Sequence, residues 1–244
     1  MLIFSFFVIA LIYATVGFGG GSSYLAVLAM MKVPFDIMPK LGLICNLLVV
    51  SGGCYHYYRQ GHINKKLIAP FVLTSLPMAF LGGLFPISKK AFLVLLIGSL
   101  FFAGLRLLFI TNSSIVVPKL PARTPAMIVG ALLGLLSGMV GLGGGIFLSP
   151  IMMNLRWGKT KEIAATASVF IFLNSIAGLF GHFIKSGTEG LGEYWMLFLA
   201  VVIGGQIGSR IGTHSRISEN LIQKTTATLI LFISVRLLWS VVNS

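Results

Sequence analysis

Apolar residues run through this chain in long stretches, which short polar or glycine-rich segments interrupt. A helix needs roughly 20 apolar residues to cross a hydrocarbon core of about 30 Å, and stretches near this length recur from end to end. The pattern predicts an all-α integral membrane protein with about eight transmembrane segments. Helices are expected over residues 2 to 16, 21 to 31, 36 to 58, 66 to 86 and 89 to 110, and again over 125 to 140, 145 to 156, 161 to 185, 191 to 212 and 218 to 241.

The chain contains an internal duplication. The hexapeptide VGFGGG at residues 16 to 21 recurs as VGLGGG at residues 140 to 145, an offset of 124, and Asn46 matches Asn174 at an offset of 128. Slowly drifting offsets are what a duplicated unit with small loop insertions produces. We therefore expect a single membrane domain over residues 1 to 244, with repeats at 1 to 110 and 124 to 244 joined by a linker at 111 to 123.

The glycine clusters decide how the repeats are oriented. If each cluster ends a re-entrant hairpin, the repeats are inverted; if the chain crosses there as one broken helix, they are parallel. The inverted arrangement places twelve of the eighteen basic residues on one side of the membrane, whereas the parallel one divides them ten to eight. Because cytoplasmic loops are enriched in Lys and Arg, the charges favour inverted repeats with the amino terminus outside.

The composition supports a lipid environment. Hydrophobic residues make up 57% of the chain and charged residues only 9%, which is too apolar for a soluble domain. The net charge of +13 would suggest nucleic acid in a soluble protein. Here the basic residues fall mostly in short loops, so the positive-inside rule explains them and we expect no nucleic-acid partner.

The glycine clusters are the first candidate for binding chemistry. Glycines break a helix and release backbone groups that lipid cannot satisfy, so such a break must be buried in protein or line a wet cavity. A new helix begins directly after each cluster, and its amides and positive dipole end favour an anion. Tight helix packing is the alternative explanation. The candidate residues are Gly19, Gly20, Gly21, Ser22 and Ser23 in the first half and Gly143, Gly144 and Gly145 in the second.

Polar side chains within the following helices extend this candidate site. Lys40 lies about one turn into its helix, where it either meets an anion or reaches to the membrane interface. Asn46 and Asn174 can donate to an anion without adding charge, or hydrogen-bond between helices. Thr166 and Ser168 are candidates near Asn174 in the second half.

Two histidines are candidates for a proton relay, and the carboxylates are informative by their positions. His56 and His182 lie near the ends of the two corresponding helices, where interfacial positions are the alternative. All five acidic residues fall in expected loops or helix starts, so the expected membrane interior lacks the carboxylate that cation carriers commonly use. The glycine run lacks the Gly-Lys-Ser/Thr ending of a nucleotide-binding loop, and we expect neither a cofactor nor a metal.

The paired glycine motifs resemble those of the TauE/SafE family of sulfite and organosulfonate exporters, over essentially the whole chain. The residues that carry the resemblance are Gly17 to Gly21, Pro39, Lys40 and Asn46, then Gly141 to Gly145, Pro150, residues 165 to 168 and Asn174. The resemblance implies a multi-pass protein of the bacterial inner membrane that moves sulfite, sulfoacetate or a similar anion, usually outward.

Together these patterns predict a secondary transporter, not an enzyme, that binds a small anion between two repeats. We expect it to work by alternating access, in which one half rocks against the other. Its expected partners are the anionic substrate and membrane lipid. The sequence leaves open whether the protein forms a homodimer. An anion channel is one alternative. An intramembrane serine protease that uses Ser137 with a histidine is another, although no facing nucleophile and base can be inferred.

Overall fold

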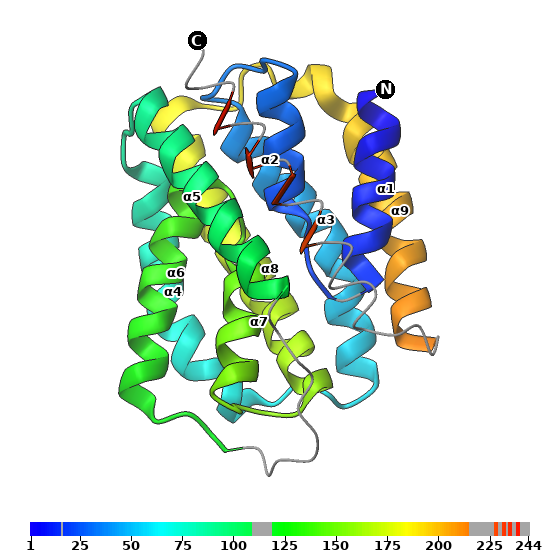
Figure 1. The fold of residues 1–244 in the computed structure, drawn as a ribbon, viewed down its shortest axis with the longest axis vertical. Coiled ribbons are helices and arrows are strands. Elements are labelled where there is room, and N and C mark those ends of the chain that lie inside the picture. Colours follow the sequence, from blue (N-terminus) through cyan, green and yellow to red (C-terminus); the bar gives the residue numbers. More distant parts are fainter. Residues whose placement is uncertain are drawn as a thin grey trace.

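The computed structural model describes residues 1–15, 17–108 and 119–214, together with eight helical residues between 227 and 239. In these ranges the chain forms helices and short connections, with no strand (Figure 1). The first half contains α1 (Leu2–Thr15), α2 (Gly21–Met30), α3 (Met38–Arg59), α4 (Lys65–Leu84) and α5 (Lys89–Leu108). The second contains α6 (Arg123–Val140), α7 (Gly145–Asn154), α8 (Thr160–Ser186), a 3-10 turn η1 (Leu191–Tyr194) and α9 (Trp195–His214).

Helices α1 to α8 begin and end within two residues of the positions that the sequence predicts. The helix expected at 191 to 212 is divided into η1 and α9, so α9 itself begins four residues later than expected. Helix α6 begins at Arg123, inside the expected linker, and the rest of that linker up to residue 118 lies outside the described residues. The expected last helix at 218 to 241 also lies largely outside them.

Five helices in the described part of the chain are long and apolar enough to cross a membrane: Met38–Arg59, Lys65–Leu84, Arg123–Val140, Thr160–Ser186 and Leu191–Gly212. The shorter apolar helices are α1, α2 and α7. Helix α2 has only 10 residues, about 15 Å at 1.5 Å per residue, so it cannot cross alone. The fold is that of a multi-pass membrane protein.

Two pairs of helices form hairpins that enter from opposite ends of the molecule. Helix α1 runs from the end near the amino terminus towards the middle, and α2 returns to the same end (Figure 1). Helices α6 and α7 do the same from the other end (Figure 1). As a result, the two glycine clusters at the hairpin tips lie in the interior of the bundle.

Helices α3 and α8 cross the centre of the molecule side by side and antiparallel. The start of α3 meets the end of α8, where the Lys40 Nζ donates to the carbonyl oxygens of Ser186 at 3.3 Å and Gly187 at 3.1 Å. At the opposite end, the Asn64 Nδ2 donates to the Glu162 Oε1 at 3.2 Å. Asn64 also begins α4, because its side chain accepts hydrogen bonds from the amides of Lys66 and Leu67.

Glycines spaced four residues apart allow two helix pairs to pack backbone to backbone. On α6, a Cβ at Gly130, Gly134 or Gly138 would overlap the carbonyl oxygen of Phe71, Ser75 or Ala79 on α4. On α9, a Cβ at Gly204, Gly208 or Gly212 would overlap the carbonyl oxygen of Phe7, Leu11 or Thr15 on α1. Such small-residue stripes are a common way for membrane helices to approach closely.

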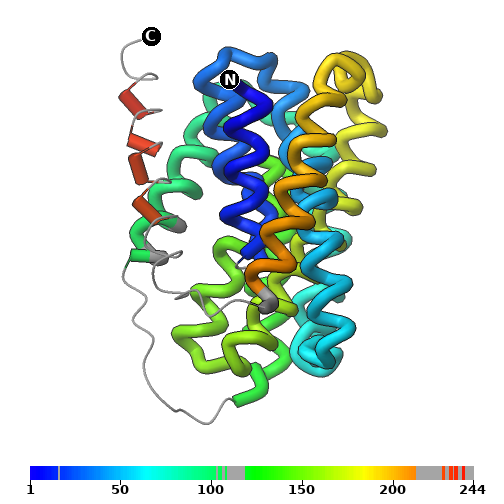
Figure 2. Tube along the Cα trace, turned by 90° about the vertical axis from the view of Figure 1, so that its right-hand side faces the viewer, coloured from blue at the N-terminus to red at the C-terminus, as the bar shows by residue number. Residues whose placement is uncertain are grey.

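The stripes join helices from different halves of the chain and thereby divide the molecule into two bundles. Helix α9 packs against α1 and α3, and α2 packs against α3; we name these four helices the first bundle. Helix α4 packs against α6 and α8, and α7 packs against α8; these four are the second bundle. The principal contact between the bundles is that of α3 with α8, which Figure 2 shows behind α1 and α9.

Candidate functional site

The breaks after α1 and α6 have closely similar backbone conformations. Gly17 and Gly141 have φ angles of 78° and 85°, and Gly20 and Gly144 have φ angles of 80° and 77°, values in the left-handed region that glycine readily adopts. Helices α2 and α7 then begin at Gly21 and Gly145. Neither Gly20 nor Gly144 can supply a side chain to cap the new helix, so the first amides are left for another acceptor.

Asn46 of α3 lies where the two breaks meet. A Cβ at Gly19 or Gly21 of the first break would overlap the Asn46 amide, and a Cβ at Gly143 of the second would lie 2.7 Å from its Nδ2. The side chain is fully buried, with 0% exposure, and neither its Nδ2 nor its Oδ1 has a hydrogen-bond partner within the described structure. An unpaired buried amide costs free energy, so Asn46 has unused hydrogen-bonding capacity at the point where the two breaks meet.

Hydroxyl groups surround the start of α2. Ser22 and Ser23 are buried, and the hydroxyls of Ser23 and Tyr13 share a hydrogen bond of 2.7 Å. The Tyr24 hydroxyl is buried and has no partner among the described residues, while its ring stacks on Phe6 with centroids 4.7 Å apart. The sequence analysis missed both tyrosines. A signal was present, because Tyr13 lies in the last turn before the break and Tyr24 in the first turn after it.

The second half contributes less polar chemistry to the meeting point. The side chain that packs against Gly143 and Gly145 is Ile171, not Asn174. The Asn174 Nδ2 donates to the carbonyl oxygen of Phe170 in its own helix at 2.8 Å, and its Oδ1 is buried without a described partner. Although Asn46 and Asn174 match in the sequence repeat, they therefore differ in their surroundings.

The other two candidates on α8 donate to backbone carbonyls. The Ser168 hydroxyl bonds the carbonyl oxygen of Gly17 at 2.8 Å and that of Ala164 at 3.0 Å, so it connects α8 to the first break. The Thr166 hydroxyl bonds the carbonyl oxygen of Glu162 at 2.7 Å, within its own helix. Ser168 thus belongs to the wall of the meeting point, whereas Thr166 is occupied elsewhere.

Lys40 lies in the first turn of α3, directly after Pro39, which packs against Gly141 of the second break. Its exposure is 1%, and its ammonium group holds the carbonyl-terminated end of α8 through the two bonds described above. A cation at a helix carboxyl terminus interacts favourably with the helix dipole. The structure thus gives Lys40 a capping contact and does not bring it beside Asn46, which lies six residues, or about 9 Å, further along the helix.

The two histidines are far apart. His56 is near the end of α3, and His182 is one turn before the end of α8, which meets the start of α3. At 1.5 Å per residue the antiparallel helices separate these side chains by about 20 Å. His182 is buried, and its Nε2 is 2.8 Å from the Gly138 carbonyl oxygen, a contact in which the nitrogen must be the donor.

The Ser137 hydroxyl, which the protease alternative requires as a nucleophile, has no hydrogen-bond partner in the part of the chain that the structure describes. His182 instead contacts the carbonyl of the next residue, Gly138. The described residues also contain no group of three or more His, Cys, Asp or Glu side chains that could hold a metal ion.

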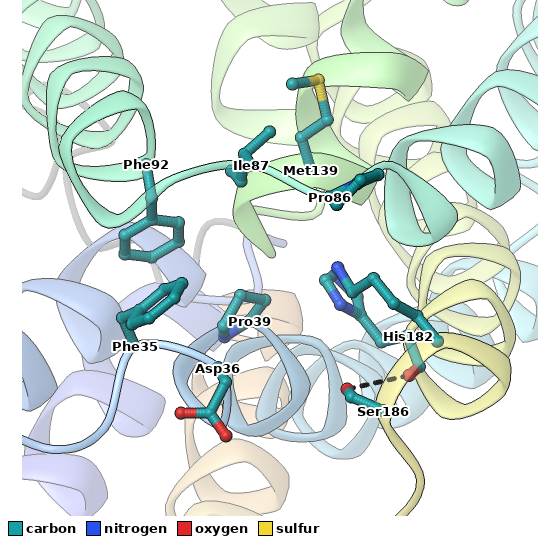
Figure 3. Close-up of a pocket in the computed structure, with 10 residues that line it drawn as sticks. Phe35, Asp36, Pro39, Pro86, Ile87, Phe92, Met139, His182 and Ser186 are labelled. Carbon is teal, nitrogen blue, oxygen red and sulfur yellow. Dashed lines mark hydrogen bonds between the residues drawn. The ribbon is translucent and has the colours of Figure 1, made fainter.

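A separate pocket of about 160 Å³ opens at the end of the molecule where α3 begins and α8 ends (Figure 3). Two loops form its mouth, and buried side chains form its floor. The lining residues are Phe35, Asp36, Pro39, Pro86, Ile87, Phe92, Met139, His182, Lys185 and Ser186. Pro39 on this floor packs against Gly141, so the pocket ends next to the second break.

Comparison with known proteins agrees with a multi-pass membrane protein. The chain belongs to the sulfite exporter TauE/SafE family, whose model matches residues 2–237. It is 32% identical to the probable membrane transporter protein y4hK of Sinorhizobium fredii, over 98% of this chain and 97% of that protein. It is 26% identical to the probable membrane transporter protein YdhB of Bacillus subtilis, over 87% and 88% of the two chains.

A more distant relative extends the comparison to an archaeon. The probable membrane transporter protein MJ0441 of Methanocaldococcus jannaschii is 24% identical over 78% of this chain and 74% of its own length. The comparison with solved structures gave no significant match. The family and these relatives support a membrane transporter.

Proposed function

We propose that this protein is a secondary transporter that exports a small anion, with sulfite or an organosulfonate such as sulfoacetate as the substrate. The observation that carries this proposal is the Asn46 amide, which is buried, unpartnered and held between the two glycine breaks. An oxyanion at this point would accept hydrogen bonds from the Nδ2 of Asn46 and from the first amides of α2 and α7.

The electrostatics of this point favour an anion over a cation. Helices α2 and α7 both begin here, and the amino-terminal end of a helix carries a partial positive charge. The described carboxylates, in contrast, lie in connections or at helix starts, as in Asp36, Glu162, Glu189 and Glu193. Substrate selectivity would therefore come from amides and hydroxyls and not from a charged side chain.

The backbone supports inverted repeats. Left-handed residues occur in pairs at the same offset of 124: Gly17 with Gly141, Gly20 with Gly144, and Lys32 with Arg156. Each of the last pair follows a short helix and is the less common case of a non-glycine residue at positive φ. Since the hairpins of α1 with α2 and of α6 with α7 enter from opposite ends, the repeats would be related by an axis in the membrane plane (Figure 1).

We further propose that the two bundles, and not the two sequence halves, are the bodies that move during alternating access. Rocking one half against the other would separate α1 from α9 and α4 from α6, which pack backbone to backbone. Rocking the first bundle against the second changes chiefly the contact of α3 with α8. This contact contains Ser168, and Asn46 lies on the same helix α3, so the motion would open the anion site to one side at a time.

The basic loops suggest which side faces the cytoplasm. Lys65 and Lys66 begin α4, Arg123 begins α6, and Lys159 and Lys161 flank the start of α8, all at one end of the molecule. By the positive-inside rule this end would face the cytoplasm of a bacterial inner membrane. The pocket at the opposite end would then face outward.

The substitution Asn46→Leu tests the proposal. It removes the unpaired amide at similar volume, so the free energy of unfolding should rise by about 1–3 kcal/mol, while transport should be lost. The assay is uptake of sulfite or sulfoacetate into proteoliposomes, with thermal unfolding of the same preparation. Ser51→Ala, on the exposed side of α3, is the matched control. Transport that survives in Asn46→Leu would sink the assignment of the site.

The dependence of the flux on substrate concentration distinguishes a carrier from an anion channel. A carrier saturates with substrate and accelerates when substrate is present on the other side of the membrane, whereas a channel does neither. The residues of the first glycine break are buried, and Pro39 packs against Gly141 of the second break. Because both breaks are covered, this arrangement favours a carrier over an open channel. Linear flux without exchange would overturn the carrier mechanism while leaving the anion site in place.

A further inference from the structure

We propose that the pocket between α3, α5, α6 and α8 is a second binding site, which takes a small organic anion with an apolar body and one acidic head group. This inference rests on the proposed function in one respect only: the pocket is taken as the outward end of the substrate path. It assigns the exported substrate to short organic sulfonates or carboxylates in preference to a bare inorganic oxyanion.

The walls of the pocket are suited to an apolar body. Phe35 and Phe92 lie together on one side, Ile87 and Met139 lie next to each other along another edge, and Pro39 lies between these groups (Figure 3). Pro39 and Phe92 are buried and form a fixed floor. A bare sulfite ion would gain nothing from these surfaces, because its whole surface is polar and would lose hydration there.

The cavity also has the size of a short organic acid. Its volume of about 160 Å³ exceeds the roughly 30 Å³ that one water molecule occupies in the liquid by about fivefold. A three- or four-carbon sulfonate fits such a space, and an inorganic oxyanion would fill only part of it.

A cation is available for the acidic head group at the mouth of the pocket. Lys185 is exposed there, and its Nζ makes a long contact of 3.4 Å with the Phe85 carbonyl oxygen. An ammonium group has three donors, so this contact leaves capacity for a ligand. The nearby Lys40 adds positive charge, although its own donors are directed to the end of α8.

The other titratable groups at the pocket fit this reading. The carboxylate of Asp36 points away from the centre of the pocket, towards the outside (Figure 3). His182 keeps its Nε2 on the Gly138 carbonyl oxygen and presents the ring as part of the wall. The acidic head group would therefore lie on the Lys185 side, with the apolar body towards Phe92 and Met139.

The position of the pocket connects it to the buried site. Its floor residue Pro39 packs against Gly141. Gly42, one turn further along α3, is so close to the same residue that a Cβ there would lie 2.8 Å from the Gly141 carbonyl oxygen. These small residues separate the pocket from the second break by one layer of backbone. Movement of α3 relative to α6 and α8 would open this layer, so a ligand could pass between Asn46 and the pocket.

The test measures binding of 1-propanesulfonate and of sulfite to the purified full-length protein by thermal-shift titration. Propanesulfonate should stabilise the protein in a saturable way, and Lys185→Gln should weaken its binding about tenfold, the effect expected for one charge-assisted contact. In the Asn46→Leu background, which removes the buried site, Met139→Trp fills the pocket and should abolish the remaining binding. Lys90→Gln, at an exposed lysine of α5 outside the pocket lining, is the matched control and should leave the affinity unchanged.

The outcomes separate this inference from the proposed function. If Asn46→Leu abolishes transport yet keeps propanesulfonate binding, the pocket is a distinct site and both ideas stand. If propanesulfonate binding is unaffected by Lys185→Gln and by Met139→Trp, the pocket site is overturned, whatever transport shows. If propanesulfonate binding is lost when the protein is placed in phosphatidylglycerol nanodiscs, the pocket holds lipid head groups. This result would also overturn the proposed site.

Discussion

At the scale of single residues, the glycines of the breaks differ in what they do. Gly17, Gly20, Gly141 and Gly144 provide left-handed backbone, whereas Gly21 is helical and simply leaves room for the Asn46 amide. The sequence predicts that these clusters form a site, and it includes Asn46 among the candidates. It does not predict that Asn46 alone meets both breaks, because that contact depends on how two distant segments cross.

Gly21→Ala should abolish transport with little loss of folding. The new methyl group would overlap Asn46 and displace its amide from the meeting point, while alanine suits the helix better than glycine by up to about 1 kcal/mol. Gly98→Ala in α5 is the control, because nothing lies within 4 Å of its Cβ position. Proteoliposome uptake and thermal unfolding measure the two effects, and normal uptake by Gly21→Ala would contradict the prediction.

Lys40→Met should lower stability more than it changes substrate affinity. It removes two hydrogen bonds from a buried ammonium to the end of α8, which is expected to cost about 1–3 kcal/mol. The sequence makes Lys40 a candidate for anion binding because a buried lysine needs a partner, yet it cannot identify that partner. A tenfold rise in KM with unchanged thermal stability would show that Lys40 binds substrate instead.

At the scale of elements, the hydrophobic pattern predicts the described helices and their ends well, because each apolar run ends at a polar group, glycine or proline. It does not reveal which helices pair. The stripes of Gly130, Gly134 and Gly138 and of Gly204, Gly208 and Gly212 are visible in the sequence as small residues at four-residue spacing. Their partners α4 and α1 are not, since any helix can accept a glycine stripe.

Gly134→Val should disrupt the packing of α6 on α4. A side chain at this position meets the Ser75 backbone, which cannot move aside, and overpacking of this kind costs about 1–3 kcal/mol or more. Gly192→Val, with open space around it, is the comparison variant. The measurement is the thermal midpoint in detergent, and equal midpoints for the two variants would show that the stripe is not a packing surface.

At the scale of the whole molecule, the chain duplicates in sequence but does not fold into two separate halves. Each bundle takes helices from both halves, an exchange that the internal repeat does not predict. The repeat describes how the chain was built, whereas the bundles follow from which surfaces the chain buries. The sequence therefore predicts a site near the symmetry centre and a motion of one half against the other, whereas the packing of the bundles favours a different pair of moving bodies.

A disulfide across α3 and α8 should stop transport. The Cβ positions of Gly53 and Ser168 are 4.0 Å apart, within the range of a disulfide, so Gly53→Cys with Ser168→Cys would join the two bundles. The control, Val49→Cys with Gly205→Cys, has Cβ positions 3.5 Å apart and joins α3 to α9 within the first bundle. Both are made with Cys45→Ala and Cys54→Ala, and uptake is measured before and after oxidation.

Oxidation should lower uptake about tenfold or more in the first pair, with recovery on reduction, because the disulfide stops a conformational step that transport requires. It should spare the second pair, because that disulfide joins helices of one bundle. If both oxidised proteins still transport, the bundles do not move against each other at this contact. If both are blocked, α9 moves relative to α3 and the first bundle is not one body.

The opposed hairpins also determine how the transporter would respond to voltage. One hairpin enters from each end of the molecule, so their tips lie in its interior (Figure 1). An anion held between them would have crossed about half of the electric field. A full crossing is worth about 2.3 kcal/mol per charge at 100 mV, so binding from either side would carry about 1.2 kcal/mol. The membrane potential would thus act about equally on loading and on release, and the two steps together would make export of a net negative charge electrogenic.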